Sequence, residues 1–385
     1  MIGSRSAAAV AVLAALCVCA RAGEPKLIQM IENCADGPSK LGHCSEVKVY
    51  RDVVYHASEA SITWFKRDPQ SGELVFCGDL GSDHVRTLQA LAFANGRMYR
   101  LLCKRARTRL GASLGLTWYE IDPETGDLRE KGRVRCPPSR VLLAAPDGRT
   151  LYLCDGRQPK LSWFRLDRAG RPALGGTVSG AGLGGALLAV SPDGNHLYCS
   201  PRSEDRIGWV QRKPDGSLVY GGSVSLAGPH RGDAALAEGL KLGKRVWGDL
   251  TLTADGLHLY AQVAALRGEL HRDLLRRDRR TGRLTFHHRV RFLTGKQDVG
   301  RALLVFNPAG DGGYYAQCGR RHATAGWFKR DPETGHLSAA GTFAGMQRRR
   351  ISVITLDSRA GAVYFGSASP GGLCVVRTEG QAAEP

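Results

Sequence analysis

Charged residues recur at the ends of short apolar runs in this sequence, where a fold could bring them together. A carboxylate in such a place can activate a water molecule as a general base, and a fixed arginine can stabilise the oxyanion that water creates at a carbonyl group. The candidate bases are Glu59, Asp155 and Asp249, and the candidate cations are Arg86, Arg140 and Arg301, with His322 as a further ligand-binding residue. Alternatively, these acidic and basic side chains pair with each other and tie neighbouring elements together.

Two strings have the spacing of known catalytic or cofactor loops. Residues 111–115 read Gly-Ala-Ser-Leu-Gly, as in a nucleophile elbow, and residues 180–185 read Gly-Ala-Gly-Leu-Gly-Gly, as in a dinucleotide-binding loop. Both chemistries need a strand, a sharp turn and then a helix, whereas both strings are expected in loops between β-prone runs. We therefore predict neither function and no cofactor, and no Cys or His pair has the spacing of metal ligands.

A repeated unit, clearest at residues 187–220, must position the candidate residues. The apolar run 187–190 ends at Ser-Pro-Asp-Gly, the run 196–200 follows, and the run 207–211 leads to Lys-Pro-Asp-Gly and a last run at 217–220. Short β-prone runs separated by tight turns predict antiparallel strands, here called A, B, C and D.

Edited copies of this unit fill the chain. The first half recurs at 91–101, 142–154, 250–262, 304–318 and 353–367, and the second half at 62–76, 116–130, 161–174, 274–286 and 326–340. With residues 53–56 there are seven B-like runs, which predicts an all-β, seven-bladed propeller of four-stranded antiparallel blades. Only one strand, at 373–376, follows the last B run, so we expect residues 26–31 to dock there as the missing outer strand and to close the ring.

The first 22 residues predict a secretory signal peptide. Arg5, an apolar run at 7–19 and small residues at 20–22 have the order of such a leader. We expect residues 23–385 to form one secreted or periplasmic propeller domain, without a transmembrane segment. A lipid anchor on Cys17 or Cys19 is the alternative, although neither cysteine follows a small residue.

The charge of the chain predicts an anionic ligand. Removing Arg5 and Arg21 with the leader leaves 52 basic residues against 36 acidic ones, a surplus of 16. The A–B and C–D turns fall on one face of a propeller, and the D–A and B–C loops on the other. The second set is long and basic, with basic residues within 104–109, 230–231, 241–245, 267, 320–322 and 348–350. That face is the expected binding face, unless the arginines only provide solubility.

Nine cysteines remain after the leader, an odd number for a secreted protein. Cys34 and Cys44 have a spacing that allows a disulfide. Four others, Cys103, Cys154, Cys199 and Cys318, fall at or after B strands, which predicts core packing.

The unit Ser-Pro-Asp-Gly-Asn-His-Leu-Tyr, the Trp-Phe strands and Asp-Pro-Glu-Thr-Gly-His-Leu resemble the lactonase family of seven-bladed propellers, which includes bacterial 6-phosphogluconolactonases. The repeat pattern covers nearly the whole mature chain. Ser58-Glu59 resembles the family's Asn-Glu at a B-strand end, and Asp155-Gly156 resembles its Asp-Leu-Gly, whereas the His of its Arg-His-Leu A-strand starts is missing here.

The resemblance implies a hydrolase that opens an anionic sugar lactone at the mouth of the central channel. The alternative is a non-catalytic propeller that binds an anionic glycan or a protein partner through the same loops. We expect a monomer and no nucleic-acid binding, because no basic strip interleaved with aromatic residues is present.

Overall fold

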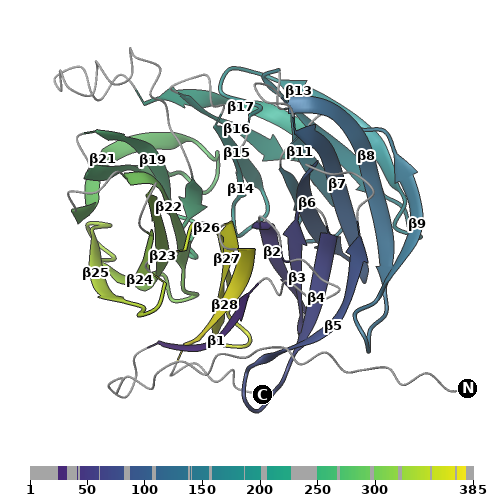
Figure 1. The fold of residues 1–385 in the computed structure, drawn as a ribbon. Coiled ribbons are helices and arrows are strands. Elements are labelled where there is room, and N and C mark those ends of the chain that lie inside the picture. The colour runs from purple at the N-terminus through teal and green to yellow at the C-terminus, as the bar shows by residue number, and fades with distance from the viewer. Residues whose placement is uncertain are drawn as a thin grey trace, which may run out of the picture.

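The computed structural model describes residues 25–32, 41, 44–59, 61–81, 87–105, 110–137, 139, 141–155, 158–185, 187–200, 206–226, 249–266, 269–294, 299–319, 323–346, 349–368 and 371–378. These residues form seven four-stranded antiparallel sheets, arranged as blades around a central axis (Figure 1). The expected seven-bladed β-propeller is confirmed.

Each blade has the predicted strands A to D, with A innermost, and the strands follow chain order in all blades except the last, whose D strand is the N-terminal β1. Blades I to IV comprise β2 (Cys44–Tyr50), β3 (Val53–Ser58), β4 (Ser61–Arg67), β5 (Leu74–Gly81); β6 (Thr87–Ala94), β7 (Arg97–Arg105), β8 (Leu110–Ile121), β9 (Leu128–Val134); β10 (Leu142–Ala144), β11 (Thr150–Cys154), β12 (Lys160–Leu166), β13 (Pro172–Ser179); and β14 (Leu187–Val190), β15 (His196–Ser200), β16 (Arg206–Arg212), β17 (Leu218–Ser225). Blades V to VII comprise β18 (Leu250–Leu252), β19 (His258–Leu266), β20 (Glu269–Arg277), β21 (Leu284–Thr294); β22 (Val299–Phe306), β23 (Gly312–Gly319), β24 (Ala323–Arg330), β25 (Leu337–Thr342); and β26 (Ile351–Asp357), β27 (Ala362–Ala368), β28 (Gly371–Arg377), β1 (Lys26–Glu32).

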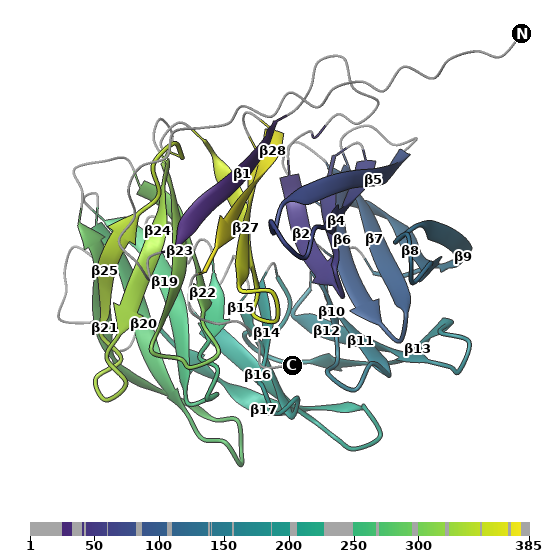
Figure 2. The same ribbon diagram turned by 90° about the horizontal axis from the view of Figure 1, so that it is seen from below.

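Strand β1 closes the ring, as predicted. It pairs antiparallel with β28, from Lys26 opposite Arg377 to Glu32 opposite Gly372, so that the last blade combines both ends of the chain (Figure 2). The Gln29 side chain adds a contact to blade I that the sequence did not suggest. Its Nε2 donates to the Leu74 carbonyl at 3.1 Å, and its Oε1 accepts from the Leu74 N–H at 2.7 Å. Strand β1 therefore holds blade VII and blade I together.

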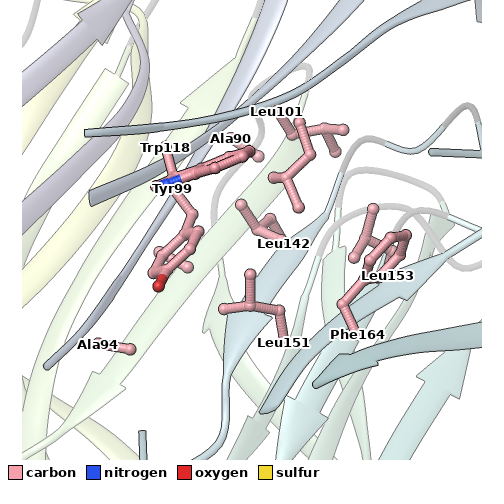
Figure 3. Close-up of a cluster of buried hydrophobic side chains, with 11 residues drawn as sticks. Ala90, Ala94, Tyr99, Leu101, Trp118, Leu142, Leu151, Leu153 and Phe164 are labelled. Carbon is pink, nitrogen blue, oxygen red and sulfur yellow. The ribbon is translucent and has the colours of Figure 1, made fainter. Parts of the chain in front are cut away.

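The core lies between successive blades. Figure 3 shows one such layer, in which side chains of β6, β7 and β8 face side chains of β10, β11 and β12. Every B strand also carries a fully buried tyrosine: Tyr55, Tyr99, Tyr152, Tyr198, Tyr260, Tyr315 and Tyr364. Four of these hydroxyls donate to a glycine carbonyl in the C–D turn of the next blade, as Tyr55 does to Gly126 at 2.8 Å. A buried hydroxyl needs such a partner, so each of these four tyrosines fixes the spacing of two blades.

A tryptophan on the C strand packs over a glycine on the D strand in five blades. Trp209, for example, lies opposite Gly222, and the register shifts at the following residue. A Cβ atom on Gly222 would come 2.8 Å from the indole ring, and the backbone there has a φ of +142°. The bulge thus needs glycine for both space and conformation.

One expectation about local structure is wrong. The string at 111–115 lies inside β8, not in a loop, because β8 continues the pairing with β7 as far as Leu110 opposite Arg105. The string at 180–185 does lie between β13 and β14. A strand interior has no sharp turn into a helix, so the first string still lacks the geometry of a nucleophile elbow.

Candidate functional site

The strand register separates two ends of the blades. A-strand starts pair with B-strand ends, as Cys44 does with Ser58, and we call this end the mouth face. The A–B and C–D turns lie at the opposite end, the turn face. Glu59 follows β3 and Asp155 follows β11, while Asp249 precedes β18, so the backbone of all three is at the mouth face. They belong to blades I, III and V and are not neighbours in the ring.

The candidate cations are described only in part. Arg301 is at the mouth-face end of β22, but its side chain lies outside the described part of the structure. Arg86, Arg140 and His322 also lie outside the described residues, as does most of each basic loop except 348–350, where Arg349 is buried and Arg350 is exposed. Their roles stay predictions.

Asp249 has a defined contact with the next blade. Its Oδ2 accepts the Leu304 N–H at 2.9 Å and the Thr251 hydroxyl at 2.9 Å. Leu304 is on β22, the innermost strand of blade VI, whose inner edge has no neighbouring strand to satisfy its backbone groups. Asp249 thus supports blade VI at the channel wall through a backbone N–H, whereas the alternative considered for these carboxylates was pairing with an arginine.

Buried polar side chains of blade V reinforce this junction. Gln262 Oε1 accepts the Ala302 N–H at 3.0 Å, and Arg272 Nη2 donates to the Ala302 carbonyl at 2.8 Å. Ala302 is next to Arg301 on β22, so blade V holds the backbone that carries this candidate cation.

Glu46, on β2, is a mouth-face carboxylate that the sequence analysis missed. In each blade, the residue after the buried B-strand tyrosine marks a common register. That residue is His56 in blade I, which pairs with Val47, and Ala261 in blade V, which pairs with Leu250. Glu46 directly precedes Val47, and Asp249 directly precedes Leu250. Glu46 therefore occupies in blade I the position of Asp249 in blade V. Its Oε2 accepts the Leu91 N–H of β6 at 2.5 Å. The sequence signal that could have identified this carboxylate is the spacing of Glu46 and Lys48, because residues two apart on a strand share one face.

Glu46 is partly buried and has a cation beside it. Its Oε1 lies 3.2 Å from the Lys48 ammonium, and the two side chains are 18% and 39% exposed. Burial raises the pKa of Glu46 above its usual value, and the positive charge of Lys48 opposes that rise in part. A half-buried carboxylate with a raised pKa, beside a cation at a channel wall, can exchange a proton and stabilise an anion.

The other two carboxylates, Asp155 and Glu59, lie in loops that follow B strands. Asp155 accepts the Gln158 N–H at 3.2 Å, within its own B–C loop, and is half-buried. Glu59 is half-buried directly after β3, at the same end of blade I as Glu46. Blade I thus has Glu59 at its mouth-face end and Glu46 in the mouth-face half of β2, while Lys48 pairs with Tyr55 farther along the strand.

Acidic and basic side chains also tie blades together at the turn face. An arginine ends the C strand in several blades and reaches the A–B turn region of the preceding blade: Arg67 to Asp357, Arg212 to Asp147, Arg277 to Asp193 and Arg330 to His258. Blades II and III have Ile121 and Leu166 there instead, which pack against apolar clusters. The turn face is therefore a structural seam.

Arg277 shows the chemistry of this seam. It donates to the Tyr198 hydroxyl, to Asp193 Oδ2 and to His196 Nδ1, each at 2.8 Å. Arginine has no acceptor, so His196 Nδ1 must be unprotonated and the ring neutral. Burial, and then the charge of Arg277, lower the pKa of His196. Burial would raise the pKa of Asp193, but hydrogen bonds from Ser191 and Arg277 lower it to about 2.

No group of three or more His, Cys, Asp or Glu side chains among the described residues could hold a metal ion. Within the same ranges, no helix has the length and apolar character needed to cross a membrane.

No family model and no curated protein matches the sequence, whereas many solved structures match the fold. A candidate 6-phosphogluconolactonase from Bacteroides uniformis aligns with a TM-score of 0.61 at 18% identity, over 83% of this chain and 88% of its own. The periplasmic gluconolactonase of Pseudomonas aeruginosa aligns with a TM-score of 0.52 at 17% identity, over 85% and 93%. Hydrazine synthase from Kuenenia stuttgartiensis aligns with a TM-score of 0.58 at 13% identity, over 90% and 98%. The chain is thus a seven-bladed propeller structurally similar to lactonases, in a fold that also carries other functions.

Proposed function

We propose that this protein is a secreted or periplasmic hydrolase that opens a sugar lactone at the mouth face of blade I. The observation that carries the proposal is the Glu46–Lys48 pair, a half-buried carboxylate and a cation 3.2 Å apart on a channel-lining strand. Similarity to structures described as lactonases supports the reaction class.

The reaction needs only what this pair supplies. Glu46 takes a proton from water, whose oxygen bonds to the lactone carbonyl carbon. The Lys48 ammonium stabilises the negative charge on the carbonyl oxygen. The ring C–O bond then breaks, and the ring oxygen becomes a hydroxyl by taking the proton from Glu46, which leaves a hydroxy acid.

The test measures acid release from phosphorylated and neutral sugar lactones, against spontaneous hydrolysis. General acid–base catalysis contributes about 10²- to 10⁴-fold, so Glu46→Gln should lower kcat by at least about 10²-fold. The glutamine can still accept the Leu91 N–H, so the melting temperature should hold. Asp249→Asn is the matched control, because Asp249 has the same register position in blade V. Equal rates in wild type and Glu46→Gln would refute the assignment.

The second candidate function is non-catalytic binding of an anionic glycan or a protein partner. The surplus of 16 positive charges in the expected mature chain, which has 52 basic and 36 acidic residues, favours it. Charge reversal of Arg140 and Arg301 should then abolish binding of a phosphorylated sugar acid. The same change at Arg168 and Arg280, exposed residues of the turn face, should leave binding intact. Equal losses would show that bulk charge attracts the ligand.

A further inference from the structure

Two cysteines face each other across the junction of blades III and IV. Tyr198 reaches forward to Gly282 of blade V, so the next residue on β15, Cys199, points back toward blade III. On β11, Cys154 is two residues after Tyr152 and has the same orientation as that tyrosine, toward blade IV. The two Sγ atoms lie 3.5 Å apart.

The surroundings of this pair are apolar and closed. Both cysteines are 0% exposed, and Leu161, Leu183 and Val210 belong to the same buried cluster. A disulfide bond is about 2.05 Å long, so the sulfur atoms need to approach by only about 1.5 Å. Both cysteines are on regular strands joined to the rest of their blades by backbone pairing, which keeps the two sulfur atoms opposite each other.

We propose that Cys154 and Cys199 form a disulfide bond that joins blade III to blade IV. The two thiols lose two protons and two electrons, and the electrons reduce a small-molecule or protein disulfide to two thiols. One thiolate first attacks that disulfide to give a mixed disulfide, and the second cysteine then displaces the leaving thiol.

The burial of the pair determines when the bond can form. A hydrogen bond to Cys199 and burial both raise the pKa of Cys154 well above its usual value, so the closed ring contains very little thiolate. Oxidation therefore takes place while blades III and IV assemble, and the finished bond is shielded from reductants. The bond closes a loop across 45 residues of sequence, which restricts the unfolded chain.

The experiment refolds the purified full chain in a buffer of reduced and oxidised glutathione. Free thiols are then alkylated in denaturant, and the peptides are mapped by mass spectrometry. The expected result is one peptide pair cross-linked through Cys154 and Cys199, with a mass lower by two hydrogens. Exposed Cys77 should be alkylated or carry glutathione. Alkylation of both Cys154 and Cys199, or their cross-linking to other cysteines, would overturn the proposal.

Thermal melting gives a second measurement. The oxidised protein should melt several degrees above the reduced protein, and Cys199→Ser should remove this difference. Cys77→Ser is the matched control and should keep it. If Cys199→Ser fails to fold, the comparison of oxidised and reduced wild type still tests the proposal. Equal melting temperatures for the cross-linked and the reduced chain would contradict a stabilising disulfide between the two blades.

Discussion

The two hydrogen bonds between the Gln29 side chain and the Leu74 backbone allow ring closure to be tested by changing one side chain. Replacing Gln29 by methionine keeps the length of the side chain but removes both hydrogen bonds to Leu74, at 3.1 and 2.7 Å. Gln29 is 9% exposed and Leu74 is 5% exposed, so water replaces these bonds poorly. Each buried backbone group left without a partner costs about 1–3 kcal/mol, so we expect the free energy of unfolding to fall by about 2–4 kcal/mol.

Urea unfolding followed by tryptophan fluorescence measures this loss, with the slope against urea unchanged. Hydrogen exchange should show faster exchange of the Leu74 N–H. Gln70→Met, at an exposed position in the adjacent turn, is the control and should change stability by less than about 0.5 kcal/mol. Deleting residues 23–33 should give the largest loss in free energy of unfolding that opening the ring can cause, because an open ring exposes two sheet edges. If Gln29→Met matches wild type in stability and Leu74 exchange, closure depends on the β1–β28 ladder alone.

Two further predictions concern buried groups. His56 is 0% exposed, and burial lowers its pKa from 6.5 to about 4. As pH falls, His56 therefore takes up a proton in the unfolded chain before it does so in the folded protein. The free energy of unfolding should fall by about 3 kcal/mol for this reason, with the full stability present above pH 6.5 and the loss occurring between about pH 6.5 and 4. Urea unfolding across this range should show a shallower pH dependence in His56→Leu, and an unchanged slope would contradict the burial argument. Gly222→Ala should cost about 1–3 kcal/mol, because its Cβ would meet Trp209 and its φ is +142°. Gly81→Ala, whose Cβ meets nothing within 4 Å, should be near neutral, and similar losses at both sites would rule out the packing explanation.

The sequence by itself determined the architecture. Strand runs, tight turns and their recurrence are local properties, so they predicted seven blades, the order A to D and the docking of β1 on β28. The string at 111–115 was misplaced, because its glycines indicate a loop while pairing with β7 extends the strand through them. Pairing with a neighbouring strand overrides local preference.

Only the tertiary structure showed which groups of the neighbouring blades the candidate carboxylates contact. The sequence singled out Asp249, yet its carboxylate accepts the Leu304 N–H of the next blade. It passed over Glu46, which shares that register position, accepts the Leu91 N–H of the next blade in the same way, and also has Lys48 beside it. The contacts of Gln29 with Leu74 and of Cys154 with Cys199 likewise join blades 45 residues apart in the sequence. Such contacts depend on how one blade packs on the next, and the residue pattern within a single blade does not show which side chains of two blades meet.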